Sequence, residues 1–484
     1  MESSARPVRP NIVVVLSDDH GYGDFGRFGH DDRVRTPHLD RLAAEGVECA
    51  NAYVTAPICS PSRSGLIAGA YQQRWGATWF GTSRFPNERT VLPERFGALG
   101  YATGYLGKVH YGPEQPGDRA CPPNHGFDES FYGLAGMQMG RLNYLRHSRA
   151  AVEEYGEEAS WRMAVQPLWE NDAEVEFEGF LTAELGRRAR QFVDDHAEVP
   201  FFLMLSFNAV HNFCAQLPDT ELAERGLPHQ SDWGPESTDD YPTWYDGAIW
   251  PELEHGRDYY AAQLELMDAE IGGLLQTLEE RGLADNTIVV YLTDNGGSTC
   301  NYGDNAPLRG GKYTLWEGGI RTPFIVRWSG GGIDGGRRCS ELVSSMDLYP
   351  TLLSAAGADR SDWAATDGVD QLDALRGLPG PRPVGRASHA ALHWDTNFQW
   401  AVRDGSWKLH TIEPSQDLDD LRDREHIAVE AGQWLTDLDA DPAETTDLST
   451  EHPEIVQRLA RLHATWRREV GMADLNIDSR EHVY

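Results

Sequence analysis

Cysteine is scarce in this sequence, and its spacing is irregular. The 484 residues contain six cysteines, at positions 49, 59, 121, 214, 300 and 339, and no two of them form a Cys-x-x-Cys pair. Disulfide-dense scaffolds and thiolate zinc sites both need closely spaced cysteines. The sequence therefore favours neither, and we expect most of these thiols to be buried as small apolar side chains.

Long apolar runs are also missing. A membrane-spanning helix needs roughly 18 to 20 apolar residues, and the longest candidate here, residues 201–210, is short and typical of a strand. The first residues are polar and are followed by no apolar signal region. We therefore expect a cytoplasmic protein with no membrane partner.

Basic residues are few compared with acidic ones. Lys and Arg number 42 against 76 Asp and Glu, which gives a formal charge of −34 at pH 7. A surface of this sign repels nucleic acid and anionic lipid over about a Debye length. The composition excludes nucleic acid as a nonspecific partner, and an anionic substrate must bind at a local basic site.

Apolar residues make up 40% of the chain, which is enough for a large buried core. Three β-branched apolar runs, at residues 11–16, 200–207 and 287–292, are typical of fully buried strands. Amphipathic helical patterns lie between them, at residues 36–46 and 257–282. Strands that alternate with helices predict an α/β fold with a large, mostly parallel sheet sandwiched by helices.

The C-terminal part of the chain has a different pattern. The stretch 358–387 is rich in Gly, Pro and Asp, and we interpret it as a linker or a long surface excursion. In residues 399–410, Asp404-Gly405 separates two strand-like halves, which predicts a hairpin. Residues 454–468 have apolar side chains at helical spacing.

These patterns predict two domains. Residues 1–380 form the α/β domain, and residues 381–484 form a smaller C-terminal α+β subdomain with an antiparallel hairpin sheet and a helix. We interpret the acidic, Trp-containing region 226–255 as an inserted loop near a binding face. The Trp residues between 161 and 250 are able to stack on a sugar or aryl ring, although core packing is the commoner use of tryptophan.

Two acidic clusters follow separate predicted strands. Asp18-Asp19 comes after the first strand, and Asp294-Asn295 comes after the strand at 287–292. In an open parallel sheet such positions converge on one crevice. Three carboxylates and one amide oxygen suit Ca²⁺ or Mg²⁺ better than a soft metal. Taken singly, each cluster has an ordinary turn or capping role as its alternative.

The segment from Cys59 to Arg63, Cys-Ser-Pro-Ser-Arg, has the composition of a helix start. With Cys59 or Ser60 at the N-cap and Pro61 in the first turn, the cysteine would lie where unpaired N–H groups favour an anion. Arg63 would point back to the same place. The alternative for a single cysteine before a helix is a packing role.

The run CSPSRSGLIAG at 59–69 resembles the signature of the type I, formylglycine-dependent sulfatases of the alkaline phosphatase-like superfamily. In that family this cysteine is oxidised after translation to Cα-formylglycine. Other segments resemble the family in the same order: TPHLDRLA at 36–43, GKVH at 107–110, GFD at 126–128, LRGGK at 308–312, EGGIRTP at 317–323 and DLYPT at 347–351. The resemblance covers most of residues 10–357.

The resemblance implies a metal site next to a sulfate site. The divalent ion, usually Ca²⁺ rather than Mg²⁺, would be held by the formylglycine at Cys59 and by Asp18, Asp19, Asp294 and Asn295. The sulfate would be surrounded by Arg63, Lys108, His110, His211 and Lys312. The segment around His211 lacks the prolines that often flank this histidine in the family.

Hydrated formylglycine has two hydroxyl groups on one carbon, and metal coordination lowers the pKa of one of them. That oxygen would attack sulfur and displace the alcohol, with His211 or Lys312 as general acid. The other hydroxyl would lose its proton to His110 and expel sulfate by elimination, which neither cysteine nor serine could do. The implied reaction is hydrolysis of a carbohydrate or aryl sulfate monoester, after maturation by a formylglycine-generating enzyme.

Two alternatives stay open at this point. A phosphonate monoester or phosphodiester hydrolase of the same superfamily uses a similar metal and nucleophile on a similar tetrahedral oxyanion. A non-catalytic protein that binds calcium and an anion is the alternative if Cys59 is not modified.

Overall fold

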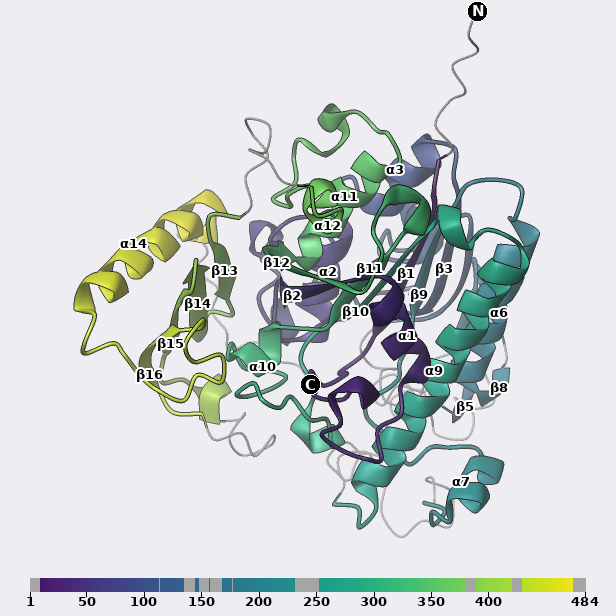
Figure 1. Ribbon diagram of the computed structural model, residues 1–484, viewed down its shortest axis with the longest axis horizontal. Coiled ribbons are helices and arrows are strands. Elements are labelled where there is room, and N and C mark those ends of the chain that lie inside the picture. Colours follow the sequence, from purple (N-terminus) through teal and green to yellow (C-terminus); the bar gives the residue numbers. More distant parts are fainter. Residues whose placement is uncertain are drawn as a thin grey trace, which may run out of the picture.

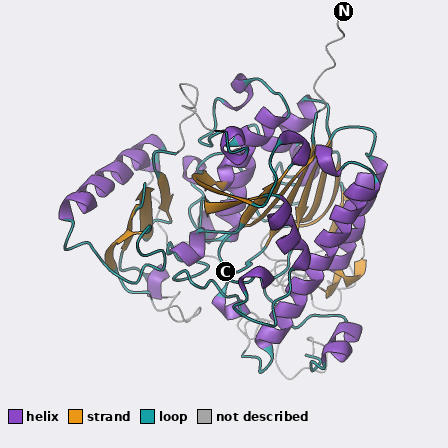
Figure 2. Ribbon diagram, in the orientation of Figure 1, coloured by secondary structure: helices purple, strands orange, loops and turns teal. Residues whose placement is uncertain are grey.

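The computed structural model describes residues 9–112, 114–134, 144–147, 156, 168–175, 177–230, 252–378, 389–419 and 429–472. Its main body is a large sheet with helices on both faces, and a smaller sheet with one long helix lies beside it (Figure 1, Figure 2). The predicted fold class, an α/β sandwich with a smaller C-terminal α+β part, is confirmed.

The main sheet has ten strands in the order β12-β2-β11-β10-β1-β9-β3-β4-β6-β7. Their bounds are β1 Asn11–Ser17, β2 Val47–Tyr53, β3 Ala102–Lys108, β4 Glu129–Gly133, β6 Leu168–Glu170, β7 Ala173–Val175, β9 Phe201–Ser206, β10 Thr287–Thr293, β11 Phe324–Arg327 and β12 Arg337–Ser344. The central strands β10, β1, β9, β3 and β4 run parallel, and antiparallel pairs occur towards both edges. The predicted strands at 11–16, 200–207 and 287–292 are three of the central ones.

Strand β1 shows why the sheet is covered on both faces. Val13 and Val15 pack in the core beneath α1 (Pro37–Glu45), α6 (Leu181–Asp195) and α9 (Gly256–Glu280). Ile12 and Val14 point the other way, towards α2 (Cys59–Ala68), α3 (Leu92–Ala98) and α11 (Leu348–Ala355). Neighbouring side chains of a strand alternate between its faces, so a continuous apolar run fits a strand buried on both sides.

The described part of the main body also contains a two-stranded antiparallel pair of β5 (Tyr144–His147) and β8 (Phe177–Phe180), and the short helices α7 (Asp219–Arg225), α10 (Glu317–Ile320) and α12 (Leu372–Leu375). The helices predicted at 36–46 and 257–282 are α1 and α9. No helix in the described ranges is long and apolar enough to cross a membrane, and the cytoplasmic location stays a prediction.

Asp268 on α9 caps the start of α1 from outside. Its two oxygens accept hydrogen bonds from the backbone N–H groups of His38, at 3.0 Å, and Leu39, at 2.8 Å. We expect Asp268→Ala to lower the free energy of unfolding by about 1–3 kcal/mol, because two helix-terminal donors lose their acceptor. Urea denaturation measures this, with the exposed Asp195→Ala on α6 as the control. A loss no larger than that of the control would contradict the capping role.

The C-terminal part contains an antiparallel sheet of β13 (Leu392–Asp395), β14 (Gln399–Asp404), β15 (Trp407–Ile412) and β16 (Gly432–Asp437), and the helix α14 (Pro453–Glu469). The predicted hairpin and C-terminal helix are therefore present. Gly405 has φ +62° in the turn between β14 and β15, a value that favours glycine. The predicted domain boundary at 380/381 lies outside the described residues and stays a prediction.

The interpretation of 358–387 as a linker or surface excursion is wrong for its described part. Residues 360–363 form a short 3₁₀ helix and Leu372–Leu375 form α12. Trp363, Leu372 and Leu375 are buried in the core of the main body. The Gly and Pro content hid a few apolar side chains that are sufficient to dock the segment.

Other expectations are tested only in part. Five of the six cysteines are buried, Cys300 is partly exposed, and all six are free thiols. Most of the region 226–255, residues 231–251, lies outside the described residues. The same is true of most tryptophans between 161 and 250, whereas Trp169 lies in β6 and packs against the core.

Candidate active site

The parallel strands bring the candidate residues to one edge of the sheet. Asp18 follows β1, Asp294 follows β10, and Lys108 is the last residue of β3. The strand ends are in register, with Ser17 opposite Thr293. The loop that leads to His211 begins after β9, between β1 and β3. The predicted convergence of the strand ends is therefore observed, and the buried side chains that meet there come from far apart in the sequence.

The acidic side chains meet the thiol of Cys59. Its Sγ lies 3.5 Å from Oδ1 of Asp18 and 4.0 Å from Oδ1 of Asp19. Ligand atoms of these three residues and of His211 all lie within 4.8 Å of one another. Asn295 donates to Oδ1 of Asp19 at 2.6 Å, and Oδ1 of Asp294 accepts from the Asp19 backbone at 3.4 Å. The structure thus brings together all five predicted metal-site residues, and their role stays a prediction.

Cys59 is the first residue of α2, and the whole helix is buried. The sequence interpretation placed the N-cap at Cys59 or Ser60, and this is wrong by one or two residues. Ile58 is the N-cap, because its backbone is extended (φ −154°, ψ 143°) and its carbonyl accepts from Ser62 at 3.2 Å. The cysteine still lies in the first turn, where helix N–H groups have no partner within the helix.

Three buried cations face these carboxylates. Nε of Arg63 lies 2.8 Å from Oδ2 of Asp294. Nζ of Lys108 contacts Oδ2 of Asp18, and Nζ of Lys312 lies 2.7 Å from Oδ2 of Asp19. The side chains of all three cations are at most 3% exposed. The site therefore holds three buried positive charges against the acidic cluster, a local source of positive charge for an anion.

The histidines complete the group. Nε2 of His211 lies 3.0 Å from Nζ of Lys312 and 3.5 Å from Oδ2 of Asp19. His110 is buried two residues after Lys108, and its backbone has φ +53°. Asp19 also has a positive φ, +57°. Such backbone conformations are costly for residues other than glycine and gather at functional sites.

The comparisons with known proteins agree with this geometry. The sequence model of the family named Sulfatase matches residues 10–358. The chain belongs to the sulfatase family. As a sulfatase-family member it is an enzyme of the sulfuric ester hydrolase class.

Two curated relatives are similar over most of the sulfatase chain. Mouse arylsulfatase J is 32% identical, over 94% of this chain and 75% of that protein. Dog N-acetylgalactosamine-6-sulfatase is 30% identical, over 84% of this chain and 73% of that protein.

Two solved structures are similar as well. Ps i-CgsB, solved in complex with k-i-k-neocarrahexaose, has a TM-score of 0.74 at 27% identity, over 95% of this chain and 92% of that one. The phosphonate monoester hydrolase of Agrobacterium radiobacter has a TM-score of 0.61 at 17% identity, over 96% of each chain, and so shares the fold.

Burial determines the protonation of the thiol and the two imidazoles of the candidate active site. Burial, together with Asp294, raises the pKa of the Cys59 thiol well above its usual value. Burial lowers the pKa of His110 and of His211 well below the usual value, and the neighbouring lysines lower it further. Near neutral pH the thiol is therefore protonated and both imidazoles are neutral.

The carboxylates respond in opposite directions. Burial and the neighbouring Asp294 together raise the pKa of Asp18 to about 7, although Lys108 and Arg63 lower it. Burial also disfavours the charged form of Asp294, but Arg63, Lys108 and Lys312 outweigh it and lower the pKa of that group. One carboxylate is thus firmly ionised beside another that has a raised pKa, an arrangement that a bound cation would relieve.

Ser206 is a functional candidate that the sequence analysis missed. It ends β9, and its Oγ lies 2.6 Å from Nη1 of Arg63. The same Oγ donates to the carbonyl of Lys108 at 2.8 Å. It therefore links the guanidinium of Arg63 to the backbone of Lys108 at the end of β3. A serine at the end of an apolar strand has no distinguishing sequence pattern, so only the fold identifies it.

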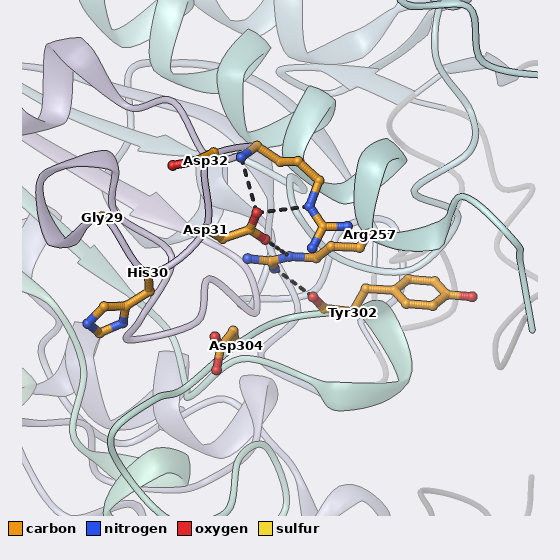
Figure 3. Close-up of a pocket in the computed structure, with 8 residues that line it drawn as sticks. Gly29, His30, Asp31, Asp32, Arg257, Tyr302 and Asp304 are labelled. Carbon is orange, nitrogen blue, oxygen red and sulfur yellow. Dashed lines mark hydrogen bonds and ion pairs between the residues drawn. The ribbon is translucent and has the colours of Figure 1, made fainter.

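A second hollow contains none of these residues. An open cavity of about 650 Å³ is lined by residues 29–33, Arg257, Tyr302 and Asp304 (Figure 3). Asp31 accepts from Nε of Arg33 and Nε of Arg257, both at 2.8 Å, and Arg257 also donates to the carbonyl of Tyr302 at 2.7 Å. These charged groups pair with one another, so the hollow is a weaker candidate for an active site than the cluster around Cys59.

Proposed function

We propose that this protein hydrolyses a carbohydrate or aryl sulfate monoester, with a formylglycine made from Cys59 and a bound divalent cation. The observation that carries the proposal is the position of Cys59, with its Sγ against Asp18 and Asp19 in a buried cluster that also holds three cations. A protonated, buried thiol is a poor nucleophile. The chemistry therefore needs the cysteine in another form.

The donor set fits a hard cation. Asp18, Asp19, Asp294 and Asn295 offer carboxylate and amide oxygens, which Ca²⁺ prefers. Oδ1 of Asn295 is buried and has no hydrogen-bond partner within the described part of the chain, so an acceptor is available. When both are present, the cation and the aldehyde hydrate supply an ionised oxygen nucleophile at neutral pH.

The three buried cations of the candidate site hold the sulfate. Each lysine ammonium has three N–H donors, and Lys108 and Lys312 use only some of them on Asp18, Asp19 and His211. The others are able to donate to sulfate oxygens. Arg63, held by Asp294 and Ser206, adds a fixed positive charge. This local charge attracts an anionic ester to a protein of strongly negative net charge.

The two histidines move protons. Burial disfavours the charged form of Lys312, but Asp19 outweighs it and the pKa of Lys312 is raised, so this ammonium stays protonated. Lys312 therefore donates to Nε2 of His211, which leaves the N–H of that ring on Nδ1. The ring gives its Nδ1 proton to the leaving alcohol while Nε2 takes a proton from the ammonium of Lys312. Neutral His110 accepts a proton in the second half of the reaction.

The fold is shared with a phosphonate monoester hydrolase, which leaves that activity as the second candidate. The test compares kcat/KM for 4-nitrophenyl sulfate and a matched 4-nitrophenyl phosphonate monoester. We expect the sulfate to be preferred. A preference for the phosphonate would overturn the proposal in favour of the second candidate.

Removal of the cation provides a separate prediction. We expect dialysis against EGTA to lower the turnover of an aryl sulfate by at least about 100-fold, because the nucleophile loses its activating charge. Calcium should restore the rate, and magnesium should restore less of it. Full activity in excess chelator would contradict the metal site.

Maturation separates the proposal from a non-catalytic role. Conversion of the Cys59 thiol to the aldehyde lowers the mass of its peptide by about 18 Da. We expect this change when the protein is expressed with a formylglycine-generating enzyme. If the thiol persists under those conditions and the protein still binds Ca²⁺ and sulfate, the binding role is favoured.

A further inference from the structure

Three aromatic side chains gather beside Lys312. The ring of Tyr313 lies 6.1 Å from that of Trp79 and 5.8 Å from that of Phe80, measured between centroids. Nζ of Lys312 lies 5.3 Å from the centroid of Tyr313. Trp79 in turn packs edge-on against Phe398, at 4.9 Å. The cluster thus has one end in the C-terminal subdomain and the other at a cation of the candidate active site.

Tyr313 adopts a backbone conformation that favours glycine. Its φ is +73°, in a region that side chains with a Cβ rarely occupy. The backbone is fixed on both sides, because its N–H donates to the carbonyl of Pro57 at 2.7 Å and its carbonyl accepts from Gln399 at 2.6 Å. A tyrosine at this position costs stability that a glycine would not, so the ring itself has a use.

Burial within the cluster is graded. Lys312 is 3% exposed and Trp79 is 8% exposed, whereas Phe80 and Tyr313 are partly exposed. The cluster therefore has a packed base and an accessible aromatic edge. The ring of Tyr313 belongs to this edge, and its centroid lies 5.3 Å from Nζ of Lys312, the ammonium that we place at the sulfate. Phe80 and Tyr313 are therefore the partly exposed aromatic side chains of this cluster next to Lys312.

We propose that Phe80 and Tyr313 form a subsite that binds a six-membered ring carrying the sulfate group. The ring presents a flat apolar face, which both an aryl ring and a pyranose have, and this face stacks on the aromatic edge. The inference rests on the proposed sulfatase function. It assigns recognition of the ring of such a carbohydrate or aryl sulfate to these two side chains, which an acyclic alkyl sulfate would not engage.

The test is a comparison of substrates by the release of inorganic sulfate from the matured enzyme. The esters are 4-nitrophenyl sulfate, methyl glucopyranoside 6-sulfate and the acyclic 2-methoxyethyl sulfate. In Tyr313→Gly we expect kcat/KM to fall about tenfold for one or both ring esters, mainly through KM, and less than about twofold for the acyclic ester. Phe80→Leu should also lower the ratio of kcat/KM for the ring esters to kcat/KM for the acyclic ester. A loss on 4-nitrophenyl sulfate alone would mean that the subsite binds an aryl ring, and a loss on the glucopyranoside sulfate alone would mean that it binds a sugar.

Glycine suits the backbone of residue 313, so Tyr313→Gly removes the ring without adding strain. Tyr313→Phe keeps the ring and should keep the preference for ring esters. Tyr302→Gly is the matched control, because Tyr302 also has a positive φ, +66°, but lines the second hollow. Its ratio of ring to acyclic kcat/KM should match the unmutated enzyme.

Two results would overturn the subsite. One is an equal loss on ring and acyclic esters in Tyr313→Gly, which would mean that Tyr313 only positions Lys312. The other is no loss on either ring ester. If the unmutated enzyme hydrolyses none of the three esters, the proposed function itself fails, and this is seen before any variant is measured.

Discussion

Cys59→Ala abolishes turnover of aryl sulfates in our account, with a loss of at least about ten-thousandfold in kcat. The reason is that alanine has no group that can become the nucleophile, while the cations that bind the sulfate are unchanged. The side chain is 0% exposed and lies against Asp18 and Asp19, so no other thiol can replace it. Continuous release of 4-nitrophenol measures the effect.

Matched variants separate chemistry from packing. Cys214 is also 0% exposed, and its nearest hydrogen-bond partner is the carbonyl of Gly256 at 3.9 Å. Cys214→Ala should keep kcat within about threefold while losing some stability, because it leaves a small cavity. Cys59→Ala should melt cooperatively, close to the unmutated protein. Comparable activity in Cys59→Ala and Cys214→Ala would contradict a catalytic Cys59.

Lys408→Met lowers the free energy of unfolding by about 3–5 kcal/mol, because it removes the cation that buried Glu444 and Glu317 share and leaves Glu317 with Arg321. Nζ of Lys408, on β15, lies 2.9 Å from Oε1 of Glu317 and 3.0 Å from Oε1 of Glu444. All three side chains are at most 1% exposed. Chemical denaturation measures the loss, and the exposed Arg41→Met serves as the control, with an expected cost below about 1 kcal/mol.

The destabilisation by Lys408→Met depends on pH with a definite sign. Burial raises the pKa of Glu444 to about 7, with a further rise from Glu317, even though Lys408 lowers it. Without the lysine, the folded-state pKa of Glu444 rises further above the unfolded value, and the lowered pKa of Glu317 rises as well. Stability then falls as pH rises through those values. We expect a larger loss at about pH 8 than at about pH 5.5, and an equal loss at both would contradict the buried ion cluster.

This ion cluster connects the C-terminal sheet to the candidate active site. Glu317 opens α10, and the following Gly318 and Gly319 pack against Gly296, the neighbour of Asn295. The backbone N–H of Gly296 donates to the carbonyl of Gly319 at 2.9 Å. A Cβ at Gly296 would lie 1.8 Å from the carbonyl oxygen of Gly318, so only glycine fits this approach. The C-terminal part therefore supports the loop that holds Asn295.

The central sheet and the convergence of its strand ends could be predicted because their signals are local. The strand runs before Asp18 and Asp294 are continuous and apolar, and parallel strands must bring their carboxyl ends to one edge. The cations needed the family resemblance as well. A single lysine such as Lys108 or Lys312 in a loop has no pattern that distinguishes it from a solvated one.

The remaining features depend on contacts between distant segments. Ser206 and the Glu317–Lys408–Glu444 cluster form only when separate parts of the chain pack together. The helix start at Ile58 was missed because a β-branched residue is an unusual N-cap, and its extended backbone is set by tertiary packing. Secondary-structure propensity and residue spacing are local measures. They therefore predict neither contacts between distant segments nor a helix start that tertiary packing sets.

One measurement tests the central claim most directly. Preparations matured to different extents are assayed for sulfate release, and the fraction of the Cys59 peptide in the aldehyde form is measured by mass spectrometry in each. We expect the rate per mole of protein to rise in proportion to that fraction and to extrapolate to zero for the pure thiol. A preparation that contains only the thiol and hydrolyses sulfate esters at the full rate would contradict the account.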